Sequence, residues 1–376
     1  MTRSEPVLFV IANLGGGGAE RALVNIINGL DRSRFRPHLA LFQKEGVFLP
    51  ELAADVPVYE IQPTDHGVLH RNWVRMRAIK RLCEQLEPAL VMSVNWQVNL
   101  VVAVADWLLR LGCPVVTNEQ VALSRHLAGA WQRHVFWVVA RRIYRRVAAV
   151  VTISEGIASE LQGGLALPSG QFRVIHNPIA IAQIRQRAEN TADIPATSHP
   201  VLVAVGRLDP QKNYPLLLRA IRRVVQEQPV TLSVIGEGRD RPRLQSLLQS
   251  LGLEPFVHLL GFQSNPYAYI KRADLFVLSS DYEGFANVIV EALAVGTPVV
   301  ATDCPYGPAE ILADGQYGRL VPPGDEQALA EAILSLLRDP AARHRLSAAG
   351  LARAEAFSVE RLVPIYERLF AEVLAS

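Results

Sequence analysis

Short apolar runs alternate with amphipathic stretches along the first half of the chain. The stretch Ala19–Leu30 has the helical repeat, because its apolar residues recur every three or four positions. The apolar runs predict β-strands at residues 7–14, 37–42, 58–61, 90–94, 114–117 and 147–153. Strands that alternate with helices indicate βαβ units, and therefore a parallel sheet.

The same alternation starts again after an interruption. Residues 183–199 are polar and contain Pro195, so we assign 181–200 to a linker. Two helices are predicted near the end of the chain, at 340–355 and 359–374. Further strands are predicted at 201–205, 231–235, 257–260, 275–278, 298–301 and 319–321. The pattern predicts an α/β protein with two Rossmann-like parallel-sheet domains, at 1–180 and 201–357. Ligands of such sheets bind outside the carboxyl ends of the strands, so we expect the site in a central cleft that both domains face.

Composition supports a packed protein of two domains. The chain has 376 residues, of which half are hydrophobic and a fifth charged. Its net charge is only +2, but residues 1–180 carry +5 and the remainder −3, so the first half is the one suited to an anionic surface. Three scattered cysteines favour a reduced, cytoplasmic chain without a disulfide framework or a cysteine-based metal site. We expect neither a cleavable signal nor a membrane span.

Glu283 and Glu291 flank the segment Gly284–Val290. If the residues after Phe285 form a helix, Glu283 precedes its N-terminus and Glu291 lies two turns inside it. The helix start favours a phosphate, and the carboxylates can accept hydrogen bonds from sugar hydroxyls. The segment therefore predicts a site for a sugar, a diphosphate and a ribose.

Two further loops follow predicted strands and suit an anion. Gly15–Gly18 opens the first helix, where glycines let backbone amides approach a phosphate; its spacing disfavours a nicotinamide cofactor. Arg207 and Lys212 share the loop after strand 201–205, where they can grip a diphosphate without a metal ion. Phe262, after strand 257–260, is a candidate neighbour of a nucleobase. A flexible turn or a solvated loop stays an alternative for each of these segments.

Polar groups also follow the strand predicted at 114–117. Asn118, Glu119 and Gln120 lie at its carboxyl end, where they can meet an acceptor or a donor sugar. An ordinary surface loop explains them equally well.

Residues 126–149 form a basic and aromatic helix candidate. No acid occurs between Glu119 and Glu155, and a second basic stretch spans Arg71–Arg81. Arginines interleaved with aromatic residues suit the surface of an anionic membrane or the phosphates of a nucleic acid. A packed helix with a solvated arginine face is the other interpretation. We favour the membrane, because the chain shows no nucleic-acid module.

Together these residues resemble the retaining GT-B glycosyltransferases of glycosyltransferase family 4, over nearly the whole chain. The likeness runs from Gly17–Arg21 through Arg207 and Lys212 to Glu283 and Glu291. Within that family, the glycine-rich start and the loop Asp303–Leu312 are similar to bacterial enzymes that build lipid-linked oligosaccharide, lipopolysaccharide core or capsule.

The resemblance implies a role for each matching residue. Arg207, Lys212 and Glu283 would be catalytic, with the two cations on the donor diphosphate and Glu283 on the transferred sugar. The remaining donor-binding residues would be Gly16, Gly17, Gly18, Phe262, Gly284, Phe285, Ala286, Asn287 and Glu291. Gln120, beside Glu119, stands where many relatives have a histidine that contacts the sugar. Residues 358–376 would form a helix that crosses back to the acceptor-binding N-terminal domain.

The resemblance also implies an activity. We expect a metal-independent, retaining transfer of a hexose or N-acetylhexosamine from a UDP-sugar to a lipid-linked or saccharide acceptor. The enzyme would work in the cytoplasm at the inner face of the membrane, contact anionic lipid through 126–149, and bind no nucleic acid. A GT-B enzyme with a soluble acceptor, a UDP-sugar epimerase and a non-catalytic GT-B scaffold stay open as alternatives.

Overall fold

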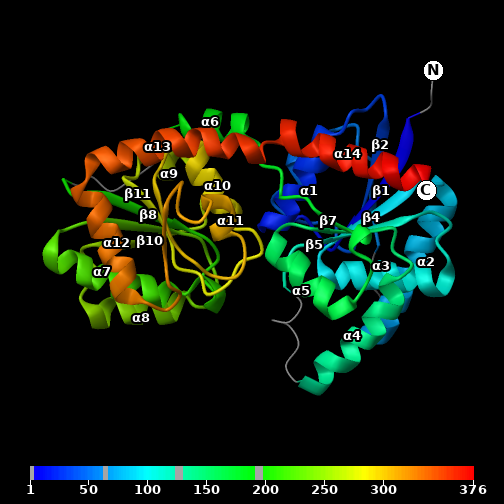
Figure 1. The fold of residues 1–376 in the computed structure, drawn as a ribbon, viewed down its shortest axis with the longest axis horizontal. Coiled ribbons are helices and arrows are strands. Elements are labelled where there is room, and N and C mark those ends of the chain that lie inside the picture. The colour runs from blue at the N-terminus through cyan, green and yellow to red at the C-terminus, as the bar shows by residue number, and fades with distance from the viewer. Residues whose placement is uncertain (1–3, 62–66, 123–129, 191–197) are drawn as a thin grey trace. The chain divides into compact units, whose positions relative to one another are not determined.

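The computed structural model describes residues 4–61, 67–122, 130–190 and 198–376. Its contacts divide the chain into two compact units. The N-terminal unit holds residues 1–178 together with 359–376, and the C-terminal unit holds 179–358. Each unit has one sheet with helices on both faces (Figure 1).

The N-terminal unit contains a parallel sheet in the order β3-β2-β1-β4-β5-β6-β7. Its first strands read as continuous apolar runs because both faces are covered. The strands are β1 (Glu5–Ile11), β2 (Phe35–Leu41), β3 (Val58–Glu60), β4 (Leu90–Val94), β5 (Val115–Glu119), β6 (Ala149–Thr152) and β7 (Phe172–Val174). The helices are α1 (Gly18–Gly29), α2 (Val68–Leu86), α3 (Trp96–Leu109), α4 (Ala130–Tyr144), α5 (Glu155–Leu165) and α14 (Val359–Ala375).

The C-terminal unit contains a six-stranded parallel sheet in the order β10-β9-β8-β11-β12-β13. Counted from its own first strand, this is the Rossmann order 3-2-1-4-5-6. The strands are β8 (Val201–Val205), β9 (Thr231–Ile235), β10 (Val257–Gly261), β11 (Leu275–Leu278), β12 (Val299–Thr302) and β13 (Arg319–Val321). The helices are α6 (Ile181–Ala188), α7 (Tyr214–Glu227), α8 (Arg241–Leu251), α9 (Tyr267–Arg272), α10 (Asn287–Ala294), α11 (Pro308–Leu312), α12 (Glu326–Arg338) and α13 (Pro340–Ala354).

The two Rossmann-like parallel sheets confirm the predicted fold class. Two of the local features that differ from the sequence prediction concern the linker and the site candidates. Residues 181–188, which we assigned to the linker, form helix α6, because Ile181, Ile184 and Ala188 bury one face in the C-terminal unit. Strand β5 runs on to Glu119, so Asn118 and Glu119 lie inside the sheet and do not follow it. Residues 191–197 of the assigned linker lie outside the described residues.

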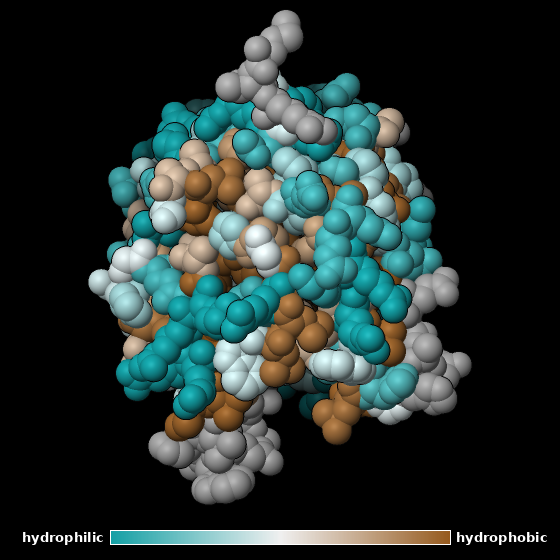
Figure 2. Space-filling view, turned by 90° about the vertical axis from the view of Figure 1, so that its right-hand side faces the viewer, coloured by the Kyte–Doolittle hydropathy of each residue, from teal (hydrophilic) through white to brown (hydrophobic). Residues whose placement is uncertain are grey.

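The surface of the N-terminal unit is mixed. On the face drawn in Figure 2, hydrophobic side chains form separate patches among hydrophilic ones. Among the helices that the structure describes, none is both long and apolar enough to cross a membrane.

Candidate active site

The C-terminal unit has a topological switch point between β8 and β11. β8 pairs with β9 on one side and with β11 on the other, so the loops that follow β8 and β11 leave toward opposite sides of the sheet. Ligands of doubly wound sheets bind at such a point, outside the carboxyl ends of the strands. Arg207 and Lys212 follow β8, and Glu283 follows β11. Candidates from two segments far apart in the chain therefore converge on the position that the topology favours.

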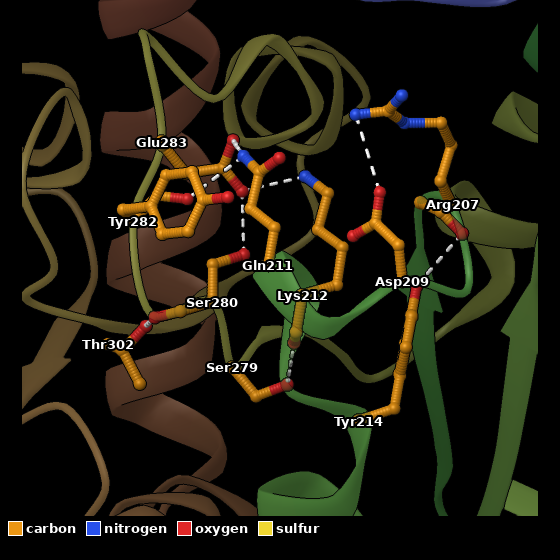
Figure 3. A network of polar contacts seen from close by, with 11 residues as sticks. Arg207, Asp209, Gln211, Lys212, Tyr214, Ser279, Ser280, Tyr282, Glu283 and Thr302 are labelled. Atoms are coloured by element: carbon orange, nitrogen blue, oxygen red, sulfur yellow. Dashed lines mark hydrogen bonds and ion pairs between the residues drawn. The ribbon is translucent and has the colours of Figure 1, made fainter. Parts of the chain in front are cut away.

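Lys212 and Glu283 form a direct ion pair at this switch point (Figure 3). Lys212 Nζ lies 2.6 Å from Glu283 Oε1, and the exposed fractions of the two side chains are 13% and 7%. The hydroxyl of Ser279 donates to the Lys212 carbonyl at 2.8 Å, which holds the lysine backbone against the end of β11. An ammonium has three donors, so this cation can hold Glu283 and an anionic ligand at once.

Ser280 and Gln211, which the sequence did not identify as site residues, contact Glu283, and Thr302 supports Ser280 (Figure 3). Ser280 Oγ donates to Glu283 Oε1 at 2.6 Å. Gln211 Nε2 donates to the Tyr282 carbonyl at 3.0 Å and makes a longer contact of 3.4 Å to Glu283 Oε2. Thr302 Oγ1 donates to the Ser280 carbonyl at 2.6 Å. The only signal in the sequence is the small polar pair at 279–280 that ends an apolar strand.

Arg207 differs from Lys212, although both lie on one loop. Its side chain is 69% exposed, and its guanidinium lies 3.4 Å from the Asp209 carboxylate. An exposed pair of this kind contributes little to stability. The guanidinium is therefore available to move onto an incoming anion.

Glycines let the loop after β9 lie against the Arg207 loop. A Cβ placed on Gly236 would come within 2.0 Å of the Gly206 carbonyl oxygen, and one on Gly238 within 2.2 Å of the Leu208 carbonyl oxygen. Both contacts are with backbone, so no side chain fits there. The two glycines at 236 and 238 thus have a packing reason. Phe262, after β10, is 58% exposed.

Helix α10 begins beside the ion pair, at Asn287. Ala286 caps it with a φ of +69°, and Glu291 lies inside it and is 7% exposed. The Phe285 ring is buried and packs edge-on against Phe357, 5.4 Å away. The segment is therefore helical where the sequence predicted, with Glu283 before its start. The ring of Phe285 belongs to the core.

Cys304 is the thiol next to this network. Burial, and after it the Glu283 carboxylate, raises the pKa of this thiol to about 12. It is protonated at neutral pH, which makes it a poor nucleophile. Within the described part of the chain, no group of three or more His, Cys, Asp and Glu side chains is arranged to hold a metal ion.

The three polar candidates of the N-terminal unit lie in a buried network. Asn118 Nδ2 donates to Tyr366 Oη of α14 at 3.0 Å, and Gln120 Nε2 donates to Asn118 Oδ1 at 2.8 Å. Tyr144 Oη donates to Glu119 Oε1 at 2.6 Å. Burial raises the pKa of Glu119 to about 7, although the bond from Tyr144 opposes the shift. These contacts hold α4, β5 and α14 together; a sugar contact by these residues stays a prediction.

The glycine-rich loop lies at the carboxyl end of β1. Gly17 is the N-cap of α1, and a Cβ there would come within 2.3 Å of the Glu20 carboxylate. Beside it, Asn13 Oδ1 accepts a hydrogen bond from the Gly15 amide at 3.1 Å. Gly16, Gly17 and Gly18 thus sit at a helix start, as predicted, and their donor-binding role stays a prediction.

The arginine-rich segment forms helix α4 from residue 130 onward. Arg141, Arg142 and Arg145 are exposed, and so are Val138 and Val139, at 58% and 52%. Arg146 pairs with Asp106 at the end of α3, next to the exposed Trp107 and Leu108. Residues 126–129 of the predicted helix lie outside the described residues. The stretch Arg71–Arg81 lies in α2, where the Arg75 guanidinium carbon stacks 4.2 Å from the centroid of the Phe42 ring.

Known proteins match the chain over almost its whole length. The protein from Campylobacter jejuni named N-acetylgalactosamine-N,N'-diacetylbacillosaminyl-diphospho-undecaprenol 4-alpha-N-acetylgalactosaminyltransferase is 27% identical, over 92% of this chain and 94% of its own. The lipopolysaccharide core biosynthesis glycosyltransferase LpsD of Rhizobium meliloti is 28% identical, over 89% of each chain. Anabaena HepE, solved in complex with UDP and glucose, has a TM-score of 0.82 at 22% identity and covers 98% of this chain and 100% of its own.

Two family models cover most of the sequence. Residues 17–178 match the model described as "Glycosyl transferase 4-like domain". Residues 186–353 match the model described as "Glycosyl transferases group 1". The chain therefore belongs to the GT4-type glycosyltransferases of the GT-B fold.

Proposed function

We propose that this glycosyltransferase moves a hexose or N-acetylhexosamine from a UDP-sugar to a lipid-linked saccharide, with retention of anomeric configuration. The observation that carries the proposal is the ion pair of Lys212 and Glu283 at the switch point of the C-terminal sheet. In this pair, a cation suited to a diphosphate lies beside a carboxylate suited to sugar hydroxyls, which supports the proposal. The named relatives act on lipid-linked and lipopolysaccharide saccharides, which supports the acceptor class.

Each charged group has a task in the proposed reaction. Arg207 and Lys212 bind the diphosphate and offset the charge that develops on it as the bond between the sugar C1 and the phosphate oxygen breaks. Glu283 accepts hydrogen bonds from hydroxyls of the transferred sugar, and Glu291 accepts them from the ribose. The acceptor oxygen forms the new bond to C1 on the same face, and its proton passes to the departing phosphate oxygen. No protein nucleophile and no metal ion takes part in this scheme.

The N-terminal unit takes the acceptor in this proposal, and its helix α4 meets the membrane. Exposed arginines suit anionic headgroups, and exposed Val138, Val139 and Trp107 suit the interface below them. The enzyme would then work at the inner face of the cytoplasmic membrane in cell-surface glycan synthesis.

The test measures donor binding and its dependence on Lys212. We expect a UDP-sugar, without added metal, to raise the melting temperature of the purified protein, because a ligand of the folded state stabilises it. GDP- and ADP-sugars are the controls that test selectivity for the nucleobase. Lys212→Ala should remove the shift and reduce transfer by a hundredfold or more, on the order expected when a charged hydrogen-bond partner is lost.

Arg222→Ala is the matched control, because this exposed cation lies on α7 outside the site. It should leave both the shift and transfer unchanged. Wild-type turnover in Lys212→Ala would contradict the proposal. Binding without transfer to any acceptor would favour the scaffold, and transfer to free sugars alone would favour the enzyme with a soluble acceptor.

A further inference from the structure

The two carboxylate oxygens of Glu283 have unequal surroundings. Oε1 receives two short hydrogen bonds, from Lys212 Nζ and from Ser280 Oγ, both at 2.6 Å. Within the described residues, Oε2 has the 3.4 Å contact from Gln211. A carboxylate offers about four acceptor positions, and those of Oε1 are largely used. Oε2 is therefore the oxygen with capacity for a ligand hydroxyl.

Ser280 is fixed independently of any ligand. It is the second residue after β11, its side chain is fully buried, and its carbonyl accepts the 2.6 Å bond from Thr302 at the end of β12. The spacing of three residues lets its hydroxyl reach back onto Glu283. The ends of β11 and β12 therefore fix Ser280, and its hydroxyl in turn fixes one carboxylate oxygen of Glu283.

The backbone of Glu283 is held as well, by a different loop. Its amide donates to the Pro305 carbonyl at 2.8 Å, and its carbonyl accepts from the Tyr306 amide at 3.0 Å. These bonds fix where the residue is but leave the torsions of its side chain free. The choice between the two oxygens therefore depends on the donors that reach the carboxylate.

Of the two donors to Oε1, Ser280 is the one that a bound diphosphate does not attract. Lys212 is a cation, so an anionic ligand competes with Glu283 for its ammonium. The serine hydroxyl is neutral, and it is buried behind the carboxylate. When Lys212 turns toward a phosphate, the bond from Ser280 is the one that keeps Oε1 in place.

We propose that Ser280 is a positioning residue, which holds Glu283 Oε1 so that Oε2 receives a hydroxyl of the transferred sugar. This inference rests on the proposed function of the site. Through Glu283, Ser280 would affect binding of the sugar and not of the nucleotide. Ser280→Ala should therefore weaken binding of a UDP-sugar and leave binding of UDP unchanged.

The experiment is a double-mutant cycle measured by calorimetry. The variants are Ser280→Ala, Glu283→Gln and the double variant, each titrated with UDP and with a panel of UDP-hexoses and UDP-N-acetylhexosamines. Ser280→Ala should lower the affinity ratio of UDP-sugar to UDP roughly tenfold or more, as expected for a hydrogen bond to a charged group. In the double variant the ratio should equal that of Glu283→Gln alone, because the serine acts through the carboxylate.

Ser233→Ala is the matched control. Ser233 is buried in β9 of the same sheet, and its hydroxyl has no hydrogen-bond partner in the described part of the chain. It should leave the affinity ratio unchanged. If Ser280→Ala does not fold, Ser280→Cys keeps a weaker donor of similar size and should lower the ratio by an intermediate factor.

Two results would overturn the inference: additive effects of Ser280→Ala and Glu283→Gln, or an equal loss of UDP and UDP-sugar binding in the serine variant. A different result would overturn the proposed function itself, namely a wild-type protein that binds neither UDP nor any UDP-sugar of the panel.

Discussion

The residue type of Glu119 gives no indication that its side chain is buried. A polar triplet after an apolar strand suggests a loop, but the strand continues through Asn118 and Glu119, which are fully buried. Tyr144 and Tyr366, 25 and 248 residues away from their partners, supply the hydrogen bonds that make this burial possible. A sequence alone does not report partners at such distances, so the burial of a carboxylate was not predictable.

The raised pKa of Glu119 makes the N-terminal unit pH-sensitive. Its carboxyl has an ordinary pKa of 4.5 when unfolded and about 7 when folded. At a pH between these two pKa values, the folded state keeps a proton that the unfolded state has released. The free energy of unfolding therefore falls as pH rises. We expect a loss of about 1.4 kcal/mol per pH unit from this group, levelling off above pH 7. Glu119→Gln, which keeps an acceptor for Tyr144, should remove that slope.

Urea unfolding followed by tryptophan fluorescence measures this, because all five tryptophans lie in the N-terminal unit. At pH 8 the glutamine variant should be more stable than wild type, and near pH 4.5 the two should be alike. Glu84→Gln, at an exposed position of α2, is the control and should keep the wild-type slope. Parallel pH profiles for wild type and Glu119→Gln would show that this carboxyl does not titrate between the two values.

At the scale of elements, the sequence predicts best the strands and helices that have a regular apolar pattern. Strands Leu90–Val94, Val201–Val205 and Thr231–Ile235 have the predicted bounds, because buried parallel strands are continuous apolar runs. Strand β7 was missed because the exposed Arg173 is the middle one of its three residues and interrupts the apolar run. Helix α6 was missed because its three apolar contacts stand in an otherwise polar segment.

The candidate site was predictable to the same degree. Its loops follow strands, and strand ends are visible in the pattern, so Lys212 and Glu283 could be named. Their ion pair was not visible, because 71 residues separate them and only the order of β8 and β11 brings them together. Ser280 was missed for a different reason: it lies only three residues from Glu283, but a serine after a strand has many ordinary explanations.

Helix α4 carries a prediction about the membrane. Arg141 and Arg142 are exposed in its last turn and Arg145 directly after it, and each arginine near an anionic surface contributes about 1 kcal/mol. Replacing these three arginines by glutamine should therefore reduce co-sedimentation with phosphatidylglycerol vesicles by about a hundredfold in partition coefficient. Arg146 is left in place because its pair with Asp106 joins α3 to the end of α4.

The control removes the same charge from elsewhere. Arg243, Arg345 and Arg368 are exposed outside α4, and their replacement by glutamine should leave co-sedimentation nearly unchanged. An equal loss in both triple variants would mean that net charge, and not α4, determines binding. Undiminished binding of the α4 variant would return this helix to a purely structural role.

For the whole molecule, the path of the chain matters more than any single contact. The chain leaves the N-terminal unit after residue 178, forms the entire C-terminal unit, and returns as α14. Phe370 packs against Phe9 and Phe35, while Glu367 accepts hydrogen bonds from the Asp31 amide at 2.7 Å and from Arg34 at 3.1 Å. The last helix is therefore part of the first unit's core, and that core is incomplete until the whole chain has been made.

A chain that ends at Ser358 should thus lose the fold of its first unit and keep that of its second. The truncation removes five buried hydrophobic side chains of α14, Leu362, Val363, Tyr366, Leu369 and Phe370. At about 1.5–3 kcal/mol each, their burial is comparable to the whole stability of a typical domain.

The core of the C-terminal unit contains no residue of α14. Tryptophan emission of the chain that ends at Ser358 should therefore match that of the urea-unfolded protein. UDP should still raise its melting temperature, which is measured by circular dichroism. A chain ending at Val373 loses only exposed residues and should behave as wild type; native emission from the shorter chain would mean that the first unit folds without α14.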